Sequence, residues 1–191
     1  MNEVNNEMIG NLKNDFNDEV FKKFPFVKIA EIITNGDLEV LSEIKKISED
    51  SERYLDENED ILDEWFFTED DTDEEELKLM LFTTVLENHN YLCSRDWKDE
   101  KEDFVYFLQN LKEVKKNNLP IDEDLLDEDG GIGEWCTILD EKWESLGFCV
   151  GDIAPWPSDS YHLFLCKLQD LEELRNLADS ADIRIDLAKN M

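Results

Sequence analysis

The sequence has few basic residues. Its 191 residues include only nineteen Lys and Arg against fifty Asp and Glu, which gives a formal net charge of −31 at pH 7. A chain this negative repels nucleic acid and anionic lipid, and it attracts basic partners. We therefore expect no direct contact with nucleic acid or a membrane, and we expect a basic protein as the partner.

The sequence also lacks a paired cysteine motif. Its four cysteines have no C-x-x-C spacing and only two histidines could assist them, whereas a zinc site needs four well-placed donors. Reactive thiols usually lie in electropositive surroundings, which this acidic chain does not provide. We expect reduced, buried thiols that behave as small apolar residues, and no metal ion or other cofactor. The residues concerned are Cys93, Cys136, Cys149, Cys166, His89 and His162.

Long apolar runs are absent as well. No stretch approaches the ~20 residues needed to span a bilayer, and residues 1–10 lack the basic start and apolar run of a signal peptide. We expect a cytoplasmic protein in a reducing compartment. Gly and Pro are scarce, but 41% of the residues are hydrophobic and eleven are Phe, five Trp and four Tyr. Such aromatics bury large areas, so the sequence predicts a folded globule with a solvated acidic shell.

Motifs of catalytic and ion-binding sites are missing or incomplete. The chain has no G-x-S-x-G nucleophile elbow and no Gly-rich phosphate loop. Ser160 and His162 would share one face of a strand, but Ser160 is a typical turn residue. The acidic segment 122–133 matches an EF-hand loop only in part, because Leu125 and Cys136 would fall where strong carboxylate ligands are needed. We expect no catalytic residues and no metal ligands.

The hydrophobic pattern changes near residue 90. Residues 1–90 are predicted to be a helical region, with Asp37 as the N-cap of a helix whose apolar stripe runs from Leu38 to Ile47. Residues 91–191 are predicted to be an α+β region, and we expect the two regions to pack as one compact unit. Strands are predicted at 91–97, 148–153, 161–166 and 183–187, and helices at 104–117, 135–146 and 168–178.

The order of these elements predicts a ferredoxin-like fold. When the helix at 135–146 is treated as an insertion, the order is βαββαβ. Right-handed crossovers then place the other helices on one face of a four-stranded antiparallel sheet. We therefore expect an α+β protein with a helical N-terminal region, although this fold carries many unrelated functions.

Two short motifs point to a family. They are Asp96-Trp97-Lys98 before a helix, and Ser158-Asp159-Ser160-Tyr161-His162-Leu163-Phe164-Leu165 along a strand. With these motifs, the chain from about Tyr91 to Leu187 resembles an uncharacterised family of acidic bacterial proteins, classed as a domain of unknown function. The resemblance implies a fold and leaves the function open.

The acidic residues after position 49 suggest a binding surface. Carboxylates along one side of a helix would form a template for Lys- and Arg-rich proteins, and exposed aromatic residues nearby would provide the apolar anchor that interfaces need. Such a partner could be a nuclease-type toxin, which would make the chain an immunity protein, or another nucleic-acid-binding protein. The predicted partner-binding residues are Glu52, Asp56, Glu59, Asp60, Asp63, Trp65, Phe66 and Trp156.

Three alternatives stay open at this point. The acidic runs could serve only solvation and solubility. A small-molecule site or an enzyme active site could lie at the sheet around Asp96, Tyr161 and His162. The chain could also be a DNA-mimic inhibitor, with carboxylates spaced like duplex phosphates.

Overall fold

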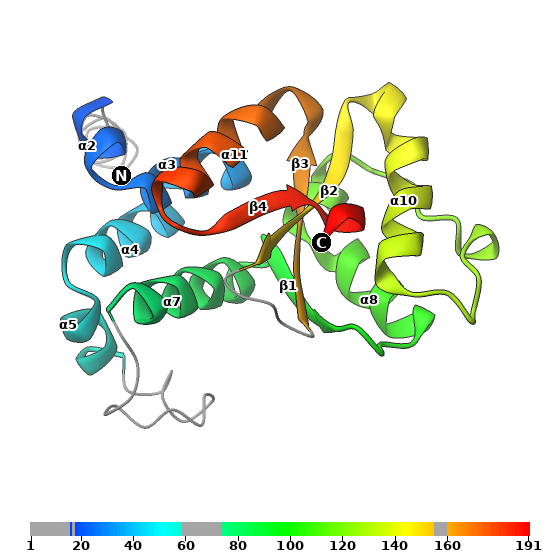
Figure 1. The fold of residues 1–191 in the computed structure, drawn as a ribbon, viewed down its shortest axis with the longest axis horizontal. Helices are drawn as coiled ribbons and strands as arrows, with labels where there is room; N and C mark the ends of the chain where they lie inside the picture. Colours follow the sequence, from blue (N-terminus) through cyan, green and yellow to red (C-terminus); the bar gives the residue numbers. More distant parts are fainter. Residues whose placement is uncertain (1–15, 17, 59–73, 155–159) are drawn as a thin grey trace, which may run out of the picture. The chain divides into compact units, whose positions relative to one another are not determined.

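The computed structural model describes residues 16, 18–58, 74–154 and 160–191. The chain divides into two compact units, Met1–Phe82 and Thr83–Met191 (Figure 1). The division falls inside helix α7 (Glu74–Asn88). Among the described residues, no helix combines the length and apolar character needed to cross a membrane.

In the described residues, the N-terminal unit consists of helices. Asn35 takes a left-handed conformation with φ of 52°, and the Gly36 N–H donates to Glu31 O at 2.9 Å, which ends the first long helix. Asp37 Oδ1 then accepts from the Glu39 N–H at 3.2 Å, so its predicted role as an N-cap is confirmed. The helices are α2 (Asp18–Lys23), α3 (Pro25–Thr34), α4 (Leu38–Glu49), α5 (Ser51–Asp56) and the first part of α7.

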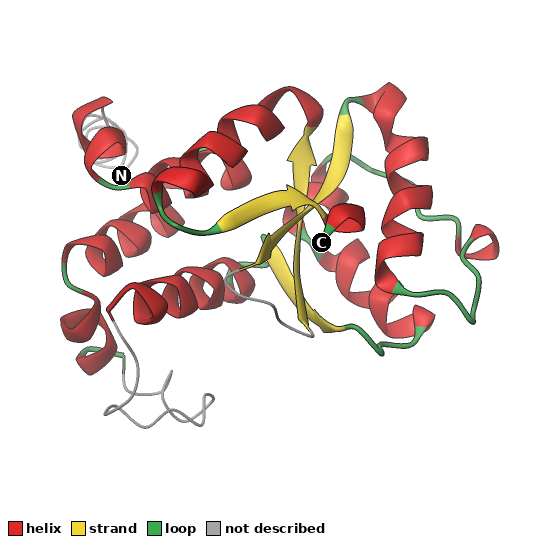
Figure 2. Cartoon of the chain, in the orientation of Figure 1, coloured by secondary structure: helices red, strands yellow, loops and turns green. Residues whose placement is uncertain are grey.

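The C-terminal unit combines helices with a four-stranded antiparallel sheet, so the predicted α+β class is confirmed (Figure 2). All four strands form where the sequence predicts them. They are β1 (Leu92–Asp96), β2 (Phe148–Ala154), β3 (Ser160–Lys167) and β4 (Arg184–Leu187). The helices and 3₁₀ turns are α8 (Lys101–Asn110), α9 (Lys112–Lys116), η1 (Glu123–Leu125), α10 (Ile132–Trp143), η2 (Glu144–Leu146), η3 (Leu168–Asp170), α11 (Leu171–Ser180) and η4 (Ala188–Asn190).

The strand order corrects the predicted topology. The order is β1-β3-β2-β4, so β4 pairs with β2, whereas a ferredoxin-like sheet places its fourth strand beside the first. The ferredoxin-like arrangement is therefore not confirmed. The connection from β1 to β2 and the connection from β3 to β4 both run toward the β4 edge of the sheet, but β1 and β3 are antiparallel. Right-handed connections therefore place their helices on opposite faces of the sheet. Figure 1 shows this arrangement, with α8 and α10 on one face and α11 on the other.

The core of the C-terminal unit lies between the sheet and α8, α9 and α10. The β3 residues Leu163 and Leu165 face this core and alternate with Phe164, which faces the α11 side. The indole N–H groups of the two largest core residues are satisfied, because Trp135 Nε1 donates to Asp127 O at 2.8 Å and Trp143 Nε1 donates to Pro120 O at 2.9 Å. Since both faces of the sheet are covered, β2 and β3 are nearly continuous apolar runs.

The helix predicted at 104–117 is broken in the structure. Leu111 has an extended ψ of 136°, and its side chain is buried in the core. The next amide, that of Lys112, donates to Asn90 O at 2.8 Å instead of to the preceding turn. This long-range bond separates α8 from α9 and ties both helices to the turn between α7 and β1.

The close contact between β2 and β3 predicts the effect of a methyl group at Gly151. A Cβ at this position would lie 2.4 Å from the Phe164 ring, which is completely buried. We expect Gly151→Ala to lower the free energy of unfolding by about 2 kcal/mol, because overpacking forces the ring out of place. The matched control is Gly133→Ala in α10, where the nearest atom is 3.8 Å away and the helix should gain about 0.5 kcal/mol. Chemical denaturation of both variants checks this, and equal effects would contradict the packing described.

Candidate functional site

The structure describes two of the eight predicted partner-binding residues. Glu52 and Asp56 lie on α5, and both side chains are exposed. The remaining predictions fall outside the described residues, so the structure does not place them. They are Glu59, Asp60, Asp63, Trp65, Phe66 and Trp156.

An open groove on the N-terminal unit runs between α4 and α5. Its lining includes the carboxylates of Glu39, Glu43 and Glu57. The Tyr54 hydroxyl donates to Glu43 Oε2 at 2.9 Å. Burial is the main cause that raises the pKa of Tyr54, and this hydrogen bond is the second. Among the described lining residues, Lys46 is the one basic side chain against three carboxylates, so these residues together carry a net negative charge. The groove therefore extends the acidic character that the sequence predicts for this part of the chain.

The C-terminal unit exposes three aromatic side chains close to the end of β1. Trp97 is 51% exposed in the turn after β1, and Tyr106 and Phe107 on α8 are 57% and 37% exposed. The Tyr106 and Phe107 rings meet edge to face, with centroids 5.1 Å apart. We name the region formed by Arg95–Asp99 together with Tyr106 and Phe107 the β1–α8 surface.

Arg95 connects the parts of the β1–α8 surface. Its guanidinium carbon lies 3.5 Å from the centroid of the Phe107 ring, and its Nη1 lies 3.0 Å from Asp99 Oδ2. Both charged side chains are only 16% exposed, and Arg95 Nε also donates to Ser94 O. The guanidinium is therefore held between an aromatic face and a carboxylate. This contact fixes the end of β1 against α8 and leaves Trp97 outside.

Carboxylates surround the exposed rings. Asp96 at the end of β1 and Glu100 in the connection to α8 are exposed, and Glu102 and Asp103 are exposed on the first turn of α8. Glu102 and Asp103 precede Tyr106 by four and three residues, so they share its side of the helix. The surface thus combines apolar anchors with negative charge, the two properties sought in the sequence for a partner-binding site.

The backbone of β1 is closed to an added strand. The Ser94 N–H and hydroxyl donate to the two oxygens of Glu87, each at 3.0 Å. Arg95 covers Ser94 O, and the Asp99 N–H donates to Asp96 O at 2.9 Å. Because these contacts occupy the Ser94 backbone groups and the Asp96 carbonyl on the edge strand, recognition near the end of β1 is expected to use side chains.

The alternative site at Asp96, Tyr161 and His162 does not converge. Tyr161 packs against the core on the α8 and α10 side. His162 lies opposite Ser94 in the β1–β3 register, and on a strand it faces away from Tyr161. Asp96 is exposed and accepts from the Lys98 N–H at 2.8 Å. Because Tyr161 and His162 lie on opposite faces of the sheet, the three side chains do not line a single pocket.

Asp152, a buried carboxylate that the sequence pattern does not indicate, lies next to the His162 backbone. Asp152 on β2 is 1% exposed, and its Oδ1 accepts from the His162 N–H at 2.5 Å. Burial raises its pKa to about 6, although backbone hydrogen bonds from His162 and Ile153 lower it in part. No hydrophobic pattern marks this residue, because an acidic side chain within a strand is normally read as solvent-facing.

The cysteines are buried and free, as the sequence predicts. Burial raises the pKa of Cys93 to about 12 and the pKa of Cys136 well above its usual value, so neither thiol favours the reactive thiolate. Within the described part of the chain, no group of three or more His, Cys, Asp or Glu side chains is arranged to hold a metal ion.

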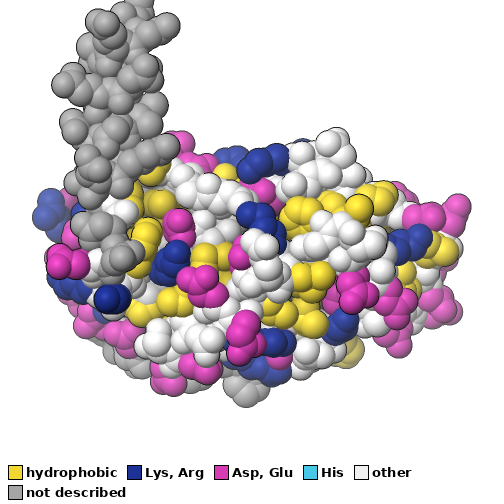
Figure 3. Space-filling view, turned by 90° about the horizontal axis from the view of Figure 1, so that it is seen from above, with side chains coloured by type: hydrophobic (Ala, Val, Ile, Leu, Met, Phe, Trp, Pro, Cys, Tyr) yellow, Lys and Arg dark blue, Asp and Glu magenta, His cyan; other side chains and the backbone are white. Residues whose placement is uncertain are grey.

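The acidic loop around η1 is solvent-exposed. Its carboxylates from Asp122 to Asp129 are all exposed, and magenta side chains gather at the end of the C-terminal unit that carries this loop (right in Figure 3). Asp127 Oδ1 accepts from the Asp129 N–H at 3.1 Å, and Asp127 O accepts from Trp135. Asp127 therefore shapes the loop, and the other carboxylates add to the negative surface.

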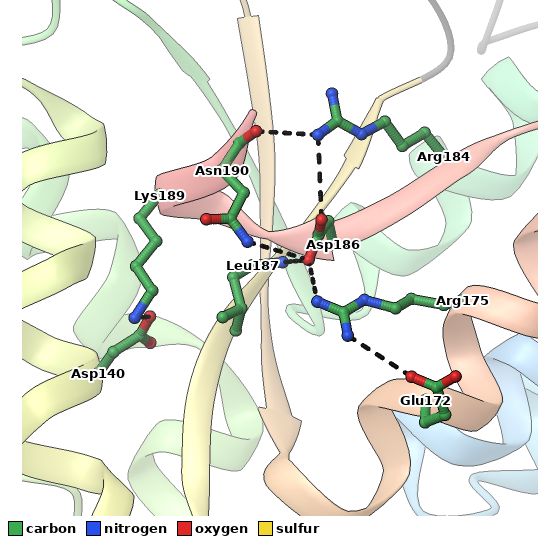
Figure 4. Close-up of polar contacts among 8 residues, drawn as sticks. All are labelled: Asp140, Glu172, Arg175, Arg184, Asp186, Leu187, Lys189 and Asn190. Carbon is green, nitrogen blue, oxygen red and sulfur yellow. Dashed lines mark hydrogen bonds and ion pairs between the residues drawn. The ribbon is translucent and has the colours of Figure 1, made fainter.

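A separate polar cluster beside β4 forms hydrogen bonds and ion pairs among its own residues (Figure 4). Asp186 pairs with Arg175, and its Oδ1 also accepts from the Leu187 N–H at 2.7 Å and from Asn190 Nδ2 at 3.3 Å. On the other side of η4, buried Asp140 accepts from the Val150 N–H at 2.8 Å and lies 3.0 Å from Lys189 Nζ. These contacts hold the C-terminal residues against the sheet, and we assign the cluster a structural role.

The hydrophobic pattern predicts a strand over 91–97 and a helix over 104–117, and it does not predict the exposed rings. A signal was present, however. Residues 104–108 read Phe-Val-Tyr-Phe-Leu, and five consecutive large side chains cannot all face one side of a helix. Since Phe104, Val105 and Leu108 are buried, the two remaining rings must lie toward solvent.

Comparison with protein families gives one match. A family model described as a domain of unknown function (DUF6630) matches residues 25–188. The match agrees with the resemblance to an uncharacterised family, but it begins well before residue 91. The comparisons with curated proteins and with solved structures found no match.

The buried carboxyl of Asp152 predicts a pH-dependent stability. Because its pKa in the folded chain is about 6, against an ordinary value of 3.8, folding favours the protonated form. The wild type should lose up to about 3 kcal/mol of stability from this group as the pH rises from 4 to 8. Asp152→Asn cannot titrate, so we expect its stability relative to wild type to increase by about this amount over the same range. Urea denaturation at both pH values checks this, and a pH-independent difference would contradict it.

Proposed function

The chain belongs to the DUF6630 family, whose description assigns no activity, and we propose that it is a non-enzymatic protein that binds a basic protein partner. The observation that supports this proposal most strongly is the β1–α8 surface. There, Trp97, Tyr106 and Phe107 are exposed among carboxylates on a chain with a net charge of −31.

The exposed rings provide apolar contact area, which charged residues alone do not. Acidic residues raise the rate of association with a basic protein, but stable interfaces also bury aromatic anchors. Trp and Tyr are the residue types that most often supply the binding energy at such interfaces. The fold leaves large parts of the Trp97 and Tyr106 rings in water, and a partner that covers them explains their position.

The net charge narrows the class of partner. A second copy of the chain would bring another 31 negative charges, and nucleic acid or an anionic membrane would also be repelled. A protein with Lys- and Arg-rich surfaces is attracted. The acidic groove lined by Glu39, Glu43 and Glu57, together with Glu52 and Asp56, adds to this attraction in the N-terminal unit.

A concrete version of the proposal is an immunity protein. Nucleases are basic where they contact nucleic acid, so an acidic protein with aromatic anchors is suited to cover that surface. In this version the protein acts in the cytoplasm and neutralises a nuclease-type toxin. A toxin gene beside the gene for this chain would support it.

The proposal predicts a salt-sensitive partner that depends on the exposed rings. We expect the wild-type chain to retain a basic protein from an extract of its own cells at 50 mM salt and to release it at 500 mM salt. The double variant Trp97→Ala/Tyr106→Ala should lose most of this protein, because the apolar anchors are removed while the net charge is unchanged. Affinity capture followed by mass spectrometry measures both effects.

The matched control is Leu146→Ala, which truncates another apolar side chain that is 52% exposed. This variant should capture the same protein as the wild type. The proposal would be contradicted if the double variant captured as much of the protein as the wild type does. It would also be contradicted if the captured protein were acidic and its capture insensitive to salt.

A further inference from the structure

We infer that the β1–α8 surface selects arginine over lysine side chains on its partner. The inference rests on the proposed function, because it names the side chain that the same surface binds. It is carried by an interaction that the surface already makes with a residue of its own chain.

Arg95 shows the mode of recognition. Its guanidinium lies 3.5 Å from the centroid of the Phe107 ring and 3.0 Å from Asp99 Oδ2. A planar guanidinium can stack on a ring with its face while its edge donates to a carboxylate. Both requirements are met at this position, and the contact is largely removed from solvent.

The same combination recurs in the exposed part of the surface. Tyr106 presents a ring that is 57% exposed, and the carboxylates of Glu102 and Asp103 lie on the same side of α8, one turn earlier. Trp97 presents a second ring, beside exposed Asp96. Lys98 Nζ, on the residue next to Trp97, lies 4.7 Å from the centroid of that ring, so an arginine of the partner would replace an ammonium there.

The chemistry of the two basic side chains explains the selection. An ammonium group is compact and strongly hydrated, and it loses much of that hydration when it contacts a ring. A guanidinium is more weakly hydrated, stacks on aromatic faces and donates two parallel hydrogen bonds to a carboxylate. A surface that offers only carboxylates attracts both side chains, whereas rings beside carboxylates favour arginine.

The experiment compares two peptide probes of equal charge on the full-length chain. One is a nine-residue arginine peptide and the other is its nine-residue lysine counterpart, both fluorescently labelled and titrated at one salt concentration. We expect the arginine peptide to bind about tenfold more tightly, since each cation–π contact contributes on the order of a several-fold gain in affinity. In Trp97→Ala/Tyr106→Ala, the two peptides should bind with equal affinity, close to that of the lysine peptide for the wild type.

Two further variants complete the test. Trp97→Phe/Tyr106→Phe keeps the rings and should keep most of the preference for arginine, and Leu146→Ala should keep all of it. If the wild type binds neither peptide, the proposed function fails together with the inference. If the wild type binds both peptides equally, only the inference is overturned. A preference that persists in the alanine double variant also overturns the inference, because arginine is then selected elsewhere.

Discussion

The packing of α8 and α10 on one face of β3 is the contact on which the C-terminal unit depends. Leu163 and Leu165 supply this face from the sheet, and Phe104 on α8 and Trp135 on α10 belong to the same core. The centroids of the Phe104 and Trp135 rings are 5.1 Å apart. This burial fixes α8 beside β1, and the connection between them then has only a few residues in which to turn. Arg95 closes that turn against Phe107 and Asp99, so the positions of the exposed rings follow from the core.

The large negative charge is not balanced within the fold. Many of the ion pairs among the described residues join side chains three or four positions apart in the sequence, such as Lys28 with Glu31 or Lys78 with Glu74. Exposed pairs of this kind contribute little to stability. The apolar core therefore stabilises the fold against its own charge repulsion, and the few basic residues are largely engaged locally. The carboxylates around Trp97 and Tyr106 remain available to a partner.

Much of this architecture could be predicted from the sequence, because strands and amphipathic helices have distinct periodicities. The four strands and the N-cap Asp37 are examples. The pairing of β4 with β2 could not be predicted, since hydrophobic alternation does not specify which strand lies beside which. The break at Leu111 depends on a hydrogen bond from Lys112 to Asn90, which no local pattern encodes. For the candidate site, the acidic character was predicted, whereas the exposed rings were not, because large aromatic residue types are usually buried.

The central claim is that the β1–α8 surface is covered by a partner. Hydroxyl-radical footprinting measures this directly, because it reports the solvent exposure of individual side chains in the chain alone and in an extract of its own cells. The account predicts that Trp97, Tyr106 and Phe107 become protected in the extract at low salt and exposed again at high salt, while Leu146 and Leu168 keep the same oxidation rate throughout. Unchanged oxidation of the three rings, with protection at other exposed residues, would contradict it.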